Sequence, residues 1–347
     1  MPRTQNRAVM NWLFIFAAIV AFLVVFGGFV RLTRSGLSIV EWNPISGSVP
    51  PTGQHDWERE FAKYQQTPEF IYVNAGMTLD EYKYIFYIEW VHRFIARLAG
   101  LVYAFPVFWF LFRKTIPWKE FGVYFLMGIL FIGQAFMGWF MVASGLVDKP
   151  AVDHFRLTLH LLLALTLLGL ALWTAFGHRY GFSSPAKTKW SSLSKLALVS
   201  FVVLLIQISY GGLVAGLKAG HVSNTWPLML GQWIPKGVFG ANGFNWVNLF
   251  EAPQTVVYIH RWFAFLGLIL VPWAYWQAKK RNYPAEIQRG LVWLIVAVTT
   301  QITLGVIVVL TNVNVPMASI HQAGAVTLFW LTIFFIHRLR AYDHARA

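Results

Sequence analysis

Eight runs of about twenty predominantly apolar residues limit this chain to one class of fold, because each is long enough to cross a bilayer as a helix. Charged residues make up only 12% of the 347 positions, against about a quarter in a soluble domain. The sequence therefore predicts an all-α integral membrane protein with eight transmembrane helices, at residues 11–30, 91–112, 121–143, 155–176, 196–217, 257–276, 290–310 and 317–337.

The basic residues predict how these helices are oriented. Lys and Arg gather before the first run and in alternate connections, such as 113–120 and 279–289. Such an excess marks cytoplasmic segments, so both termini are expected in the cytoplasm. This topology and anionic lipid account for the net charge of +14, and no nucleic-acid partner is expected. The first run has no cleavage site after it and resembles no transit peptide, which favours a retained helix in a bacterial inner (plasma) membrane.

The chain contains no cysteine. Disulfides, thiolate haem ligands, iron–sulfur clusters and covalent haem attachment through C-x-x-C-H are therefore all excluded.

The two halves of the sequence repeat one another. GGFVRLTRSGLSIVEWNP, at the end of the first run, matches GGLVAGLKAGHVSNTWP, at the end of the fifth, at an offset of 184 residues. The third and seventh runs both contain Gln-x-x-x-Gly. We expect two tandem four-helix bundles, 1–180 and 181–347, related by a pseudo-two-fold axis along the membrane normal.

Two pairs of histidines occupy matching places in the halves. His92 and His160 lie in the second and fourth runs, and His260 and His321 in the sixth and eighth. Neutral imidazole is a normal ligand of haem iron, so the pattern predicts two haem sites. Each histidine is expected within about two turns of its helix's outer end, which places both haems near the periplasmic side. The other histidines are predicted to be solvated or interfacial: His55, His154, His178, His221, His337 and His344.

One acidic residue distinguishes the halves. Glu89 lies three residues before His92, on the same helix face, whereas Val257 occupies the matching position in the second half. A carboxylate at the bilayer edge is costly unless it is used or paired. Glu89 is therefore a candidate catalytic residue, and the alternative is an ion pair with Arg93 or Arg97.

Basic residues near the histidines are candidates for binding haem propionates. Arg93 and Arg261 each follow a histidine, and Arg34 and Lys218 match one another in the repeat. The alternative for each is an anchor at the membrane interface.

Taken together, these residues resemble the haem A synthase family, in its cysteine-free, proteobacterial and mitochondrial type. The resemblance implies oxidation of a ring methyl of haem O to a formyl group, by two successive oxidations via hydroxymethyl haem, to give haem A for terminal oxidases. It implies that His260 and His321 hold one haem b cofactor, that His92 and His160 hold the substrate haem, and that Glu89 is the essential acid. The similar stretches are GGFVRLTRSGLSIVEWNPISGSVPP, EYKYIFYIEWVHR, GGLVAGLKAG…NTWPLM, NLFEAPQTVVYIHR and VPMASIHQAGA.

The resemblance also implies partners, namely a haem O synthase and a membrane electron acceptor, and it leaves a homo-oligomer open. Two other functions explain part of the pattern. A di-haem b-type cytochrome carrying electrons from quinol would explain the four histidines but not the single acid. A transporter would explain the repeat but not the histidines.

Overall fold

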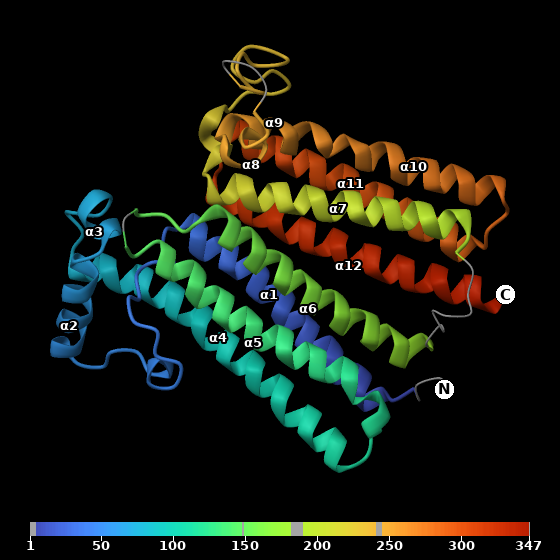
Figure 1. Cartoon of the computed structure of the whole chain (residues 1–347), viewed down its shortest axis with the longest axis horizontal. Helices are drawn as coiled ribbons and strands as arrows, with labels where there is room; N and C mark the ends of the chain where they lie inside the picture. Colours follow the sequence, from blue (N-terminus) through green and yellow to red (C-terminus); the bar gives the residue numbers. More distant parts are fainter. Residues whose placement is uncertain (1–4, 148, 182–189, 241–244, 347) are drawn as a thin grey trace. The chain divides into compact units, whose positions relative to one another are not determined.

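The computed structural model describes residues 5–147, 149–181, 190–240 and 245–346. Within these ranges the chain is mostly helical, and eight helical segments are long and apolar enough to cross a membrane. Figure 1 shows the course of the helices along the chain. The protein is therefore a multi-pass membrane protein. Its long helices are α1 (Arg7–Leu32), α4 (Leu79–Phe112), α5 (Phe121–Ser144), α6 (His154–Tyr180), α7 (Ser192–Gly216), α9 (Pro253–Phe263), α10 (Phe265–Lys280), α11 (Ala285–Leu310) and α12 (Val315–Ala345).

These helices divide into two compact units. One is Ala18–Leu167, and the other combines Met1–Ala17 with Leu168–Ala347. The division falls inside α1 and α6, so it differs from the boundary expected between 180 and 181. The pseudo-two-fold relation between two four-helix bundles stays a prediction.

In the unit Ala18–Leu167, α4 and α5 are joined by aromatic contacts. The Tyr103 hydroxyl on α4 donates a hydrogen bond to the Tyr124 carbonyl on α5. The Tyr103 ring also stacks on Phe131, with centroids 6.4 Å apart. A buried tyrosine needs such a partner for its hydroxyl, so this pair fixes α4 against α5.

The segment between α1 and α4 is more ordered than its Gly- and Pro-rich sequence indicates. It contains α2 (Gln54–Gln65), α3 (Pro68–Tyr72) and the three-residue helix η1 (Ser46–Ser48). Helix α4 also begins twelve residues before the predicted span, because Thr78 and Glu81 form a capping box. Its first turns pack in an aromatic cluster of Trp57, Tyr64, Tyr82, Ile85 and Phe86.

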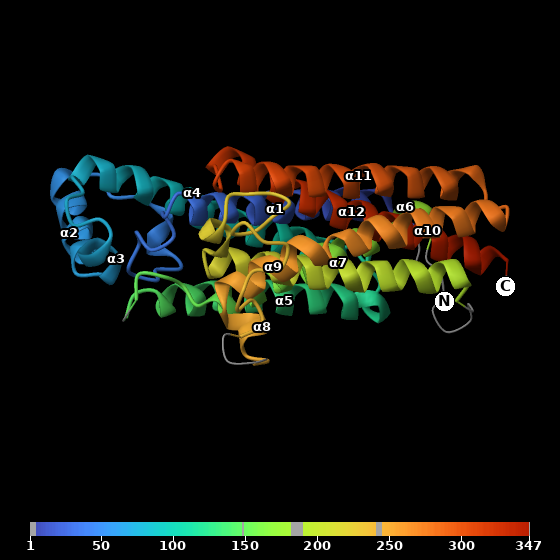
Figure 2. The ribbon, with the colours of Figure 1, turned by 90° about the horizontal axis from the view of Figure 1, so that it is seen from above.

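In the other unit, α7, α10, α11 and α12 share an apolar core. Its most deeply buried members include Leu193, Ala278, Leu291 and Leu339. Helix α10 packs against α7 and α11, and α11 packs against α12, which Figure 2 lets the reader follow from above. The predicted span 257–276 is two consecutive helices, α9 and α10, that meet at Ala264.

Two of the histidines predicted to be solvated are buried. His178 is 5% exposed and His337 only 2%. Helix α12 continues eight residues past its predicted end at 337, so His337 lies inside the helix rather than at its end. There its ring contacts Trp173 and Phe176, with centroids 5.0 and 5.8 Å away.

Candidate functional site

Each of the four paired histidines lies against a glycine on a neighbouring helix. A Cβ added at Gly27 of α1 would lie 3.2 Å from the His92 ring, and one at Gly138 of α5 would lie 3.1 Å from the His160 ring. These distances are shorter than ordinary contacts, so a larger residue would displace the imidazole. The glycines therefore give the rings their space.

The same relation holds in the second half. A Cβ at Gly211 of α7 would lie 3.2 Å from the His260 ring, and one at Gly305 of α11 would lie 3.0 Å from the His321 ring. The sequence had identified Gly138 and Gly305, but the glycine-to-histidine contact itself emerges only from the helix packing.

Glutamines one turn before three of these glycines contact the histidine rings. Gln207 Nε2 lies 3.1 Å from His260 Nδ1 and donates to the His260 carbonyl at 2.9 Å. Gln301 Nε2 makes the same two contacts with His321, at 3.2 and 2.9 Å. Gln207 was missed in the sequence, although it begins the same Gln-x-x-x-Gly pattern that had been noticed in the third and seventh runs.

The first half follows this pattern once. Gln134 Nε2 lies 3.2 Å from His160 Nε2. At the position that matches Gln207, α1 carries Leu23. The His92 ring forms a hydrogen bond with the main chain of Leu23, as the His260 and His321 rings do with the main chains of Gln207 and Gln301.

The histidines fall into the two expected pairs. His92 and His160 are near enough to repel one another electrostatically if both were protonated, and so are His260 and His321. All four rings are partly buried. Among the described residues, no group of three or more His, Asp or Glu side chains gathers as a metal site.

Paired imidazoles suit haem rather than a bare metal ion, because the porphyrin supplies the other four donors. The second-half pair fits this group well. Each ring forms a hydrogen bond with the main chain of Gln207 or Gln301, the kind of partner that a metal-bound histidine uses for the ring nitrogen that does not bind the metal. The glycines beside the rings keep the space that an added Cβ would fill.

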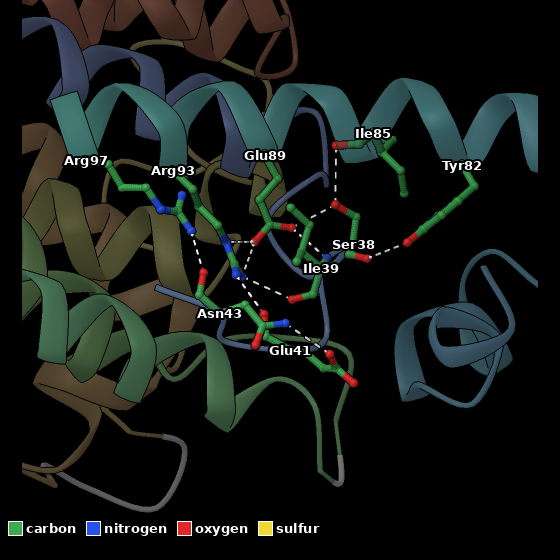
Figure 3. A network of polar contacts seen from close by, with 9 residues as sticks. All are labelled: Ser38, Ile39, Glu41, Asn43, Tyr82, Ile85, Glu89, Arg93 and Arg97. Atoms are coloured by element: carbon green, nitrogen blue, oxygen red, sulfur yellow. Dashed lines mark hydrogen bonds and ion pairs between the residues drawn. The ribbon is translucent and has the colours of Figure 1, made fainter. Parts of the chain in front are cut away.

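Glu89 is buried, at 3% exposure, and both of its carboxylate oxygens accept hydrogen bonds, as Figure 3 shows. Oε2 accepts from Ser38 Oγ at 2.7 Å and from the Ile39 amide at 2.9 Å. Oε1 accepts from Arg93 Nη2 at 2.6 Å and from Arg93 Nε at 3.0 Å. The ion pair with Arg93 that the sequence offered as an alternative is therefore present.

The second half replaces this polar pair by an apolar one. At the offset of 184, Ser38 matches Val222, and Glu89 matches Val257 by its place before the histidine. Val222 and Val257 pack in one hydrophobic cluster with Ala219. The acid and its serine partner thus occur together in one half and are absent together in the other.

Arg93 and Arg261 hold the chain that follows the first helix of each half. Arg93 donates to the carbonyls of Ile39 and Glu41, at 3.0 and 3.2 Å. Arg261 donates to the carbonyls of Ser223 and Thr225, at 2.5 and 3.0 Å.

Ile39 and Glu41 match Ser223 and Thr225 at the offset of 184. Both arginines therefore engage equivalent carbonyls, and we call this contact the arginine clamp. Whether these guanidinium groups also bind propionates stays a prediction.

Arg34 and Lys218 terminate α1 and α7 in the same way. Both adopt a left-handed backbone, with φ of 55° and 53°, and both side chains are exposed. Whether either binds a propionate stays a prediction.

Glu41, in the connection after α1, forms an ion pair with Lys63 at 2.9 Å. Hydrogen bonds from Lys63 and Asn43 hold the pKa of Glu41 below its ordinary value.

Comparison with known proteins gives one consistent result. A family model described as cytochrome oxidase assembly protein matches residues 10–333. A heme A synthase of Parvibaculum lavamentivorans is 40% identical over 335 residues, covering 96% of this chain and 95% of the relative. Similar proteins of the same name occur in Maricaulis maris (40% identity, covering 94% of each chain) and Nitrosomonas eutropha (40% identity, covering 97% of this chain and 95% of the relative).

Proposed function

The chain belongs to the cytochrome oxidase assembly protein family, and from this premise we propose that it is a haem A synthase, as its curated relatives are named. It would be an oxidoreductase that converts a ring methyl of haem O to a formyl group in two successive oxidations. The first gives hydroxymethyl haem, and the second gives a hydrated aldehyde that loses water.

The observation that carries the assignment of the reaction to one half is that a buried acid, Glu89, precedes His92 by three residues, whereas Val257 has that place before His260. Both halves have a histidine pair and an arginine clamp, and the second half keeps its clamp without any carboxylate. Glu89 is therefore not required to hold the clamp. Because a buried carboxylate is costly, its presence in the first half alone supports a role in chemistry.

We assign the substrate haem to His92 and His160, and a resident haem b to His260 and His321. The resident haem, when bound, supplies one-electron transfer. His260 and His321 would hold it, and each ring already forms a hydrogen bond with the main chain of Gln207 or Gln301.

Glu89 would act as an anion held in place beside the substrate. Ser38, Ile39 and Arg93 fix its carboxylate, so the charge is oriented before the substrate arrives. Such a preorganised charge stabilises positive charge that develops on the ring-methyl carbon, and the same oxygens can orient a water molecule. Arg93 offsets the cost of keeping this charge buried.

The distribution of basic residues supports a bacterial inner-membrane location with both termini in the cytoplasm and the haem sites towards the periplasm. The partners that follow from this function are a haem O synthase, which supplies the substrate, and a membrane electron acceptor.

The function is tested by haem extraction. The protein would be expressed in a bacterium that makes haem B and haem O but no haem A, and the bound haems would be separated by chromatography. Haem A or its hydroxymethyl precursor is the expected product. Haem B alone, with haem O plentiful in the cell, would instead indicate an electron-carrying cytochrome.

The role of Glu89 is tested in the same cells. Glu89→Gln should bind haem as before but yield no formyl product, because the neutral amide cannot stabilise developing positive charge. Glu41→Gln is the matched control, since Glu41 lies in the same network but is half-exposed. It should leave the product unchanged. Normal haem A formation by Glu89→Gln would remove Glu89 from the mechanism.

A further inference from the structure

Arg31 is a charged residue of α1 that has no counterpart in the second half. At the offset of 184 it is matched by Ala215. Gly27, one turn before it, is matched by Gly211, so the repeat itself continues through this part of the helix. The guanidinium therefore occurs only in the half assigned to the substrate haem.

Arg31 lies on the buried face of α1. Val20, Val24 and Gly27 precede it at spacings of four, three and four residues, which places all of them on one face of the helix. Val20 and Val24 are buried, and Gly27 is the residue that lies against the His92 ring. Arg31 follows about 6 Å further along the helix, towards the end expected on the periplasmic side.

Nothing in the described part of the chain neutralises the charge of Arg31. No carboxylate or carbonyl there pairs with its guanidinium, although the side chain is half-buried. Arg34 is near enough to repel it electrostatically. A buried charge is costly unless it is paired, and such a residue in a membrane protein commonly marks a substrate site. The partner of Arg31 is therefore expected to be an anion that arrives with a ligand.

Other arginines near this end of the first half are already engaged. Arg93 is paired with Glu89. Arg97 donates to two main-chain carbonyls, both at 2.8 Å, and Arg156 donates to one, also at 2.8 Å. Arg31 differs from them because it combines an unpaired charge with a place on the helix face that carries the histidine contact.

The substrate haem presents an anion that suits this position. Its propionate carboxylates extend from one edge of the ring, and arginine binds carboxylates through parallel hydrogen bonds. Histidines on either side of the iron leave the ring free to turn about the axis through them. A contact at the propionate edge removes this freedom, and it thereby selects which ring methyl faces Glu89.

We propose that Arg31 binds a propionate of the substrate haem and thereby orients the methyl that is oxidised towards Glu89. This inference rests on the proposed function, which assigns the substrate to the first half. The resident haem needs no such contact, because electron transfer selects no particular methyl, and its half has Ala215 at the matching position. A lipid phosphate is the other anion present at the membrane boundary, and the experiment distinguishes the two.

The experiment compares two haems that differ only in their carboxylates. Protein purified from haem-deficient cells is titrated with haem B and, separately, with haem B dimethyl ester, whose propionates are neutral. Binding is followed by absorbance. In Arg31→Gln, the ratio of the two affinities should fall about tenfold for one binding step, the effect of losing one hydrogen bond to a charged group. The other step, from the half with Ala215, is the internal reference and should not change.

Two further substitutions at position 31 support this comparison. Arg31→Met suits an apolar environment better than Arg31→Gln and should give the same fall in the affinity ratio, so it serves if the glutamine variant folds poorly. Arg31→Lys keeps the charge but loses the parallel hydrogen bonds, and it should retain part of the preference for the free acid.

Arg59→Gln is the matched control. It also removes one positive charge, from the connection after α1, but Arg59 is exposed and forms an ion pair with Asp56 at 3.1 Å. The ratio of affinities in this variant should equal that of the unmodified protein.

A second measurement tests the orientation of the ring. In cells that make haem O, Arg31→Gln should bind haem but yield several-fold less formyl haem per bound haem, because the ring is no longer held with one methyl at Glu89. A purely structural role would instead lower the haem content and leave the yield per bound haem unchanged.

The outcomes separate the inference from the function. If Arg31→Gln and Arg31→Met weaken both haems equally, or neither, while the unmodified protein makes haem A, the function stands and the inference is wrong. Arg31 would then pair with lipid phosphate. If the ratio falls but the unmodified protein makes no haem A, the propionate contact stands and the proposed function is wrong.

Discussion

At the scale of single residues, Glu89 is a charge whose position is set by its neighbours. Four hydrogen bonds, from Ser38, Ile39 and Arg93, hold its two oxygens. Ser38 also donates towards the Ile85 carbonyl at 3.3 Å, and its own carbonyl accepts from the Tyr82 hydroxyl. The serine is thus fixed to α4 on both sides and presents its hydroxyl to the carboxylate.

Ser38→Val makes the change that the second half itself shows at Val222. It removes one hydrogen bond to a charged group, worth about 1.5–3 kcal/mol. If the bond acts in the transition state, formyl production should fall by roughly 10- to 150-fold. The measurement is the rate of haem A formation at unchanged haem content.

Ser35→Val is the control for this substitution. Ser35 is equally buried, but its hydroxyl contacts Thr33 rather than Glu89. It should retain most of the activity. Equal rates for Ser38→Val and the unmodified protein would show that the serine does not position the acid.

At the scale of helices, each histidine depends on how closely a neighbouring helix approaches it. Gly138→Ala would place a Cβ 3.1 Å from His160, so the ring must move. We expect the substrate haem to bind at least several-fold more weakly, which a haem titration of the purified variant would measure.

Gly133→Ala, on the same helix, provides the comparison. Its Cβ would meet Leu163 at 3.7 Å, an ordinary contact. The Gly133→Ala variant should bind haem as the unmodified protein does. A loss of similar size in both variants would mean that α5 tolerates no added methyl group, and the histidine contact would not be the cause.

The start of α4 is a second helix feature that can be tested. Thr78 Oγ1 accepts from the Glu81 amide, and Glu81 Oε2 accepts from the Thr78 amide at 2.8 Å. Thr78→Ala should cost about 1 kcal/mol of local stability. Amide hydrogen exchange over residues 79–86 should rise about fivefold. If amide exchange in this segment does not change, the aromatic cluster alone is enough to stabilise the first turns of α4.

Much of the helical structure and the pairing of histidines could be predicted from the sequence, because run length and spacing are local properties. The eight spans are confirmed, whereas the binding of one haem by each histidine pair stays a prediction. His160, His260 and His321 lie within about two turns of their helix starts, but His92 lies almost four turns into α4. The start of this helix was expected at residue 91, where the apolar run begins, but α4 starts at Leu79 with several polar turns.

Side-chain partners were harder to predict. Arg93 and Arg261 hold main-chain carbonyls about fifty and forty residues away in sequence, contacts that the sequence did not indicate, and their binding of propionates stays a prediction. Such partners depend on how a long connection folds back, which spacing does not encode. Gln207 could have been found from the Gln-x-x-x-Gly pattern, but its contact with His260 joins two helices, and spacing along one helix does not encode it.

At the scale of the whole molecule, the repeat gives similar local sites different surroundings. The glycine beside each histidine, the clamp and the left-handed helix ends recur in both halves. Near the histidines the halves differ at Ser38 and Glu89, which are matched by two valines, and at Leu23, which is matched by Gln207. These positions are where a division of labour between the halves would be encoded.

The topology can be tested with single cysteines, since the chain has none of its own. Ser46→Cys, in the connection after α1, should react with an impermeant maleimide added to whole spheroplasts. Arg281→Cys, after α10, should react only once the membrane is broken. The reverse pattern would place both termini outside.

The arginine clamps have a consequence for how this protein matures. Secreted and periplasmic segments are often secured by disulfides, which form only where an oxidising system acts on them. Here Arg93 and Arg261 secure the corresponding connections with hydrogen bonds to carbonyls. Because the chain has no cysteine, folding of these connections needs no thiol oxidant.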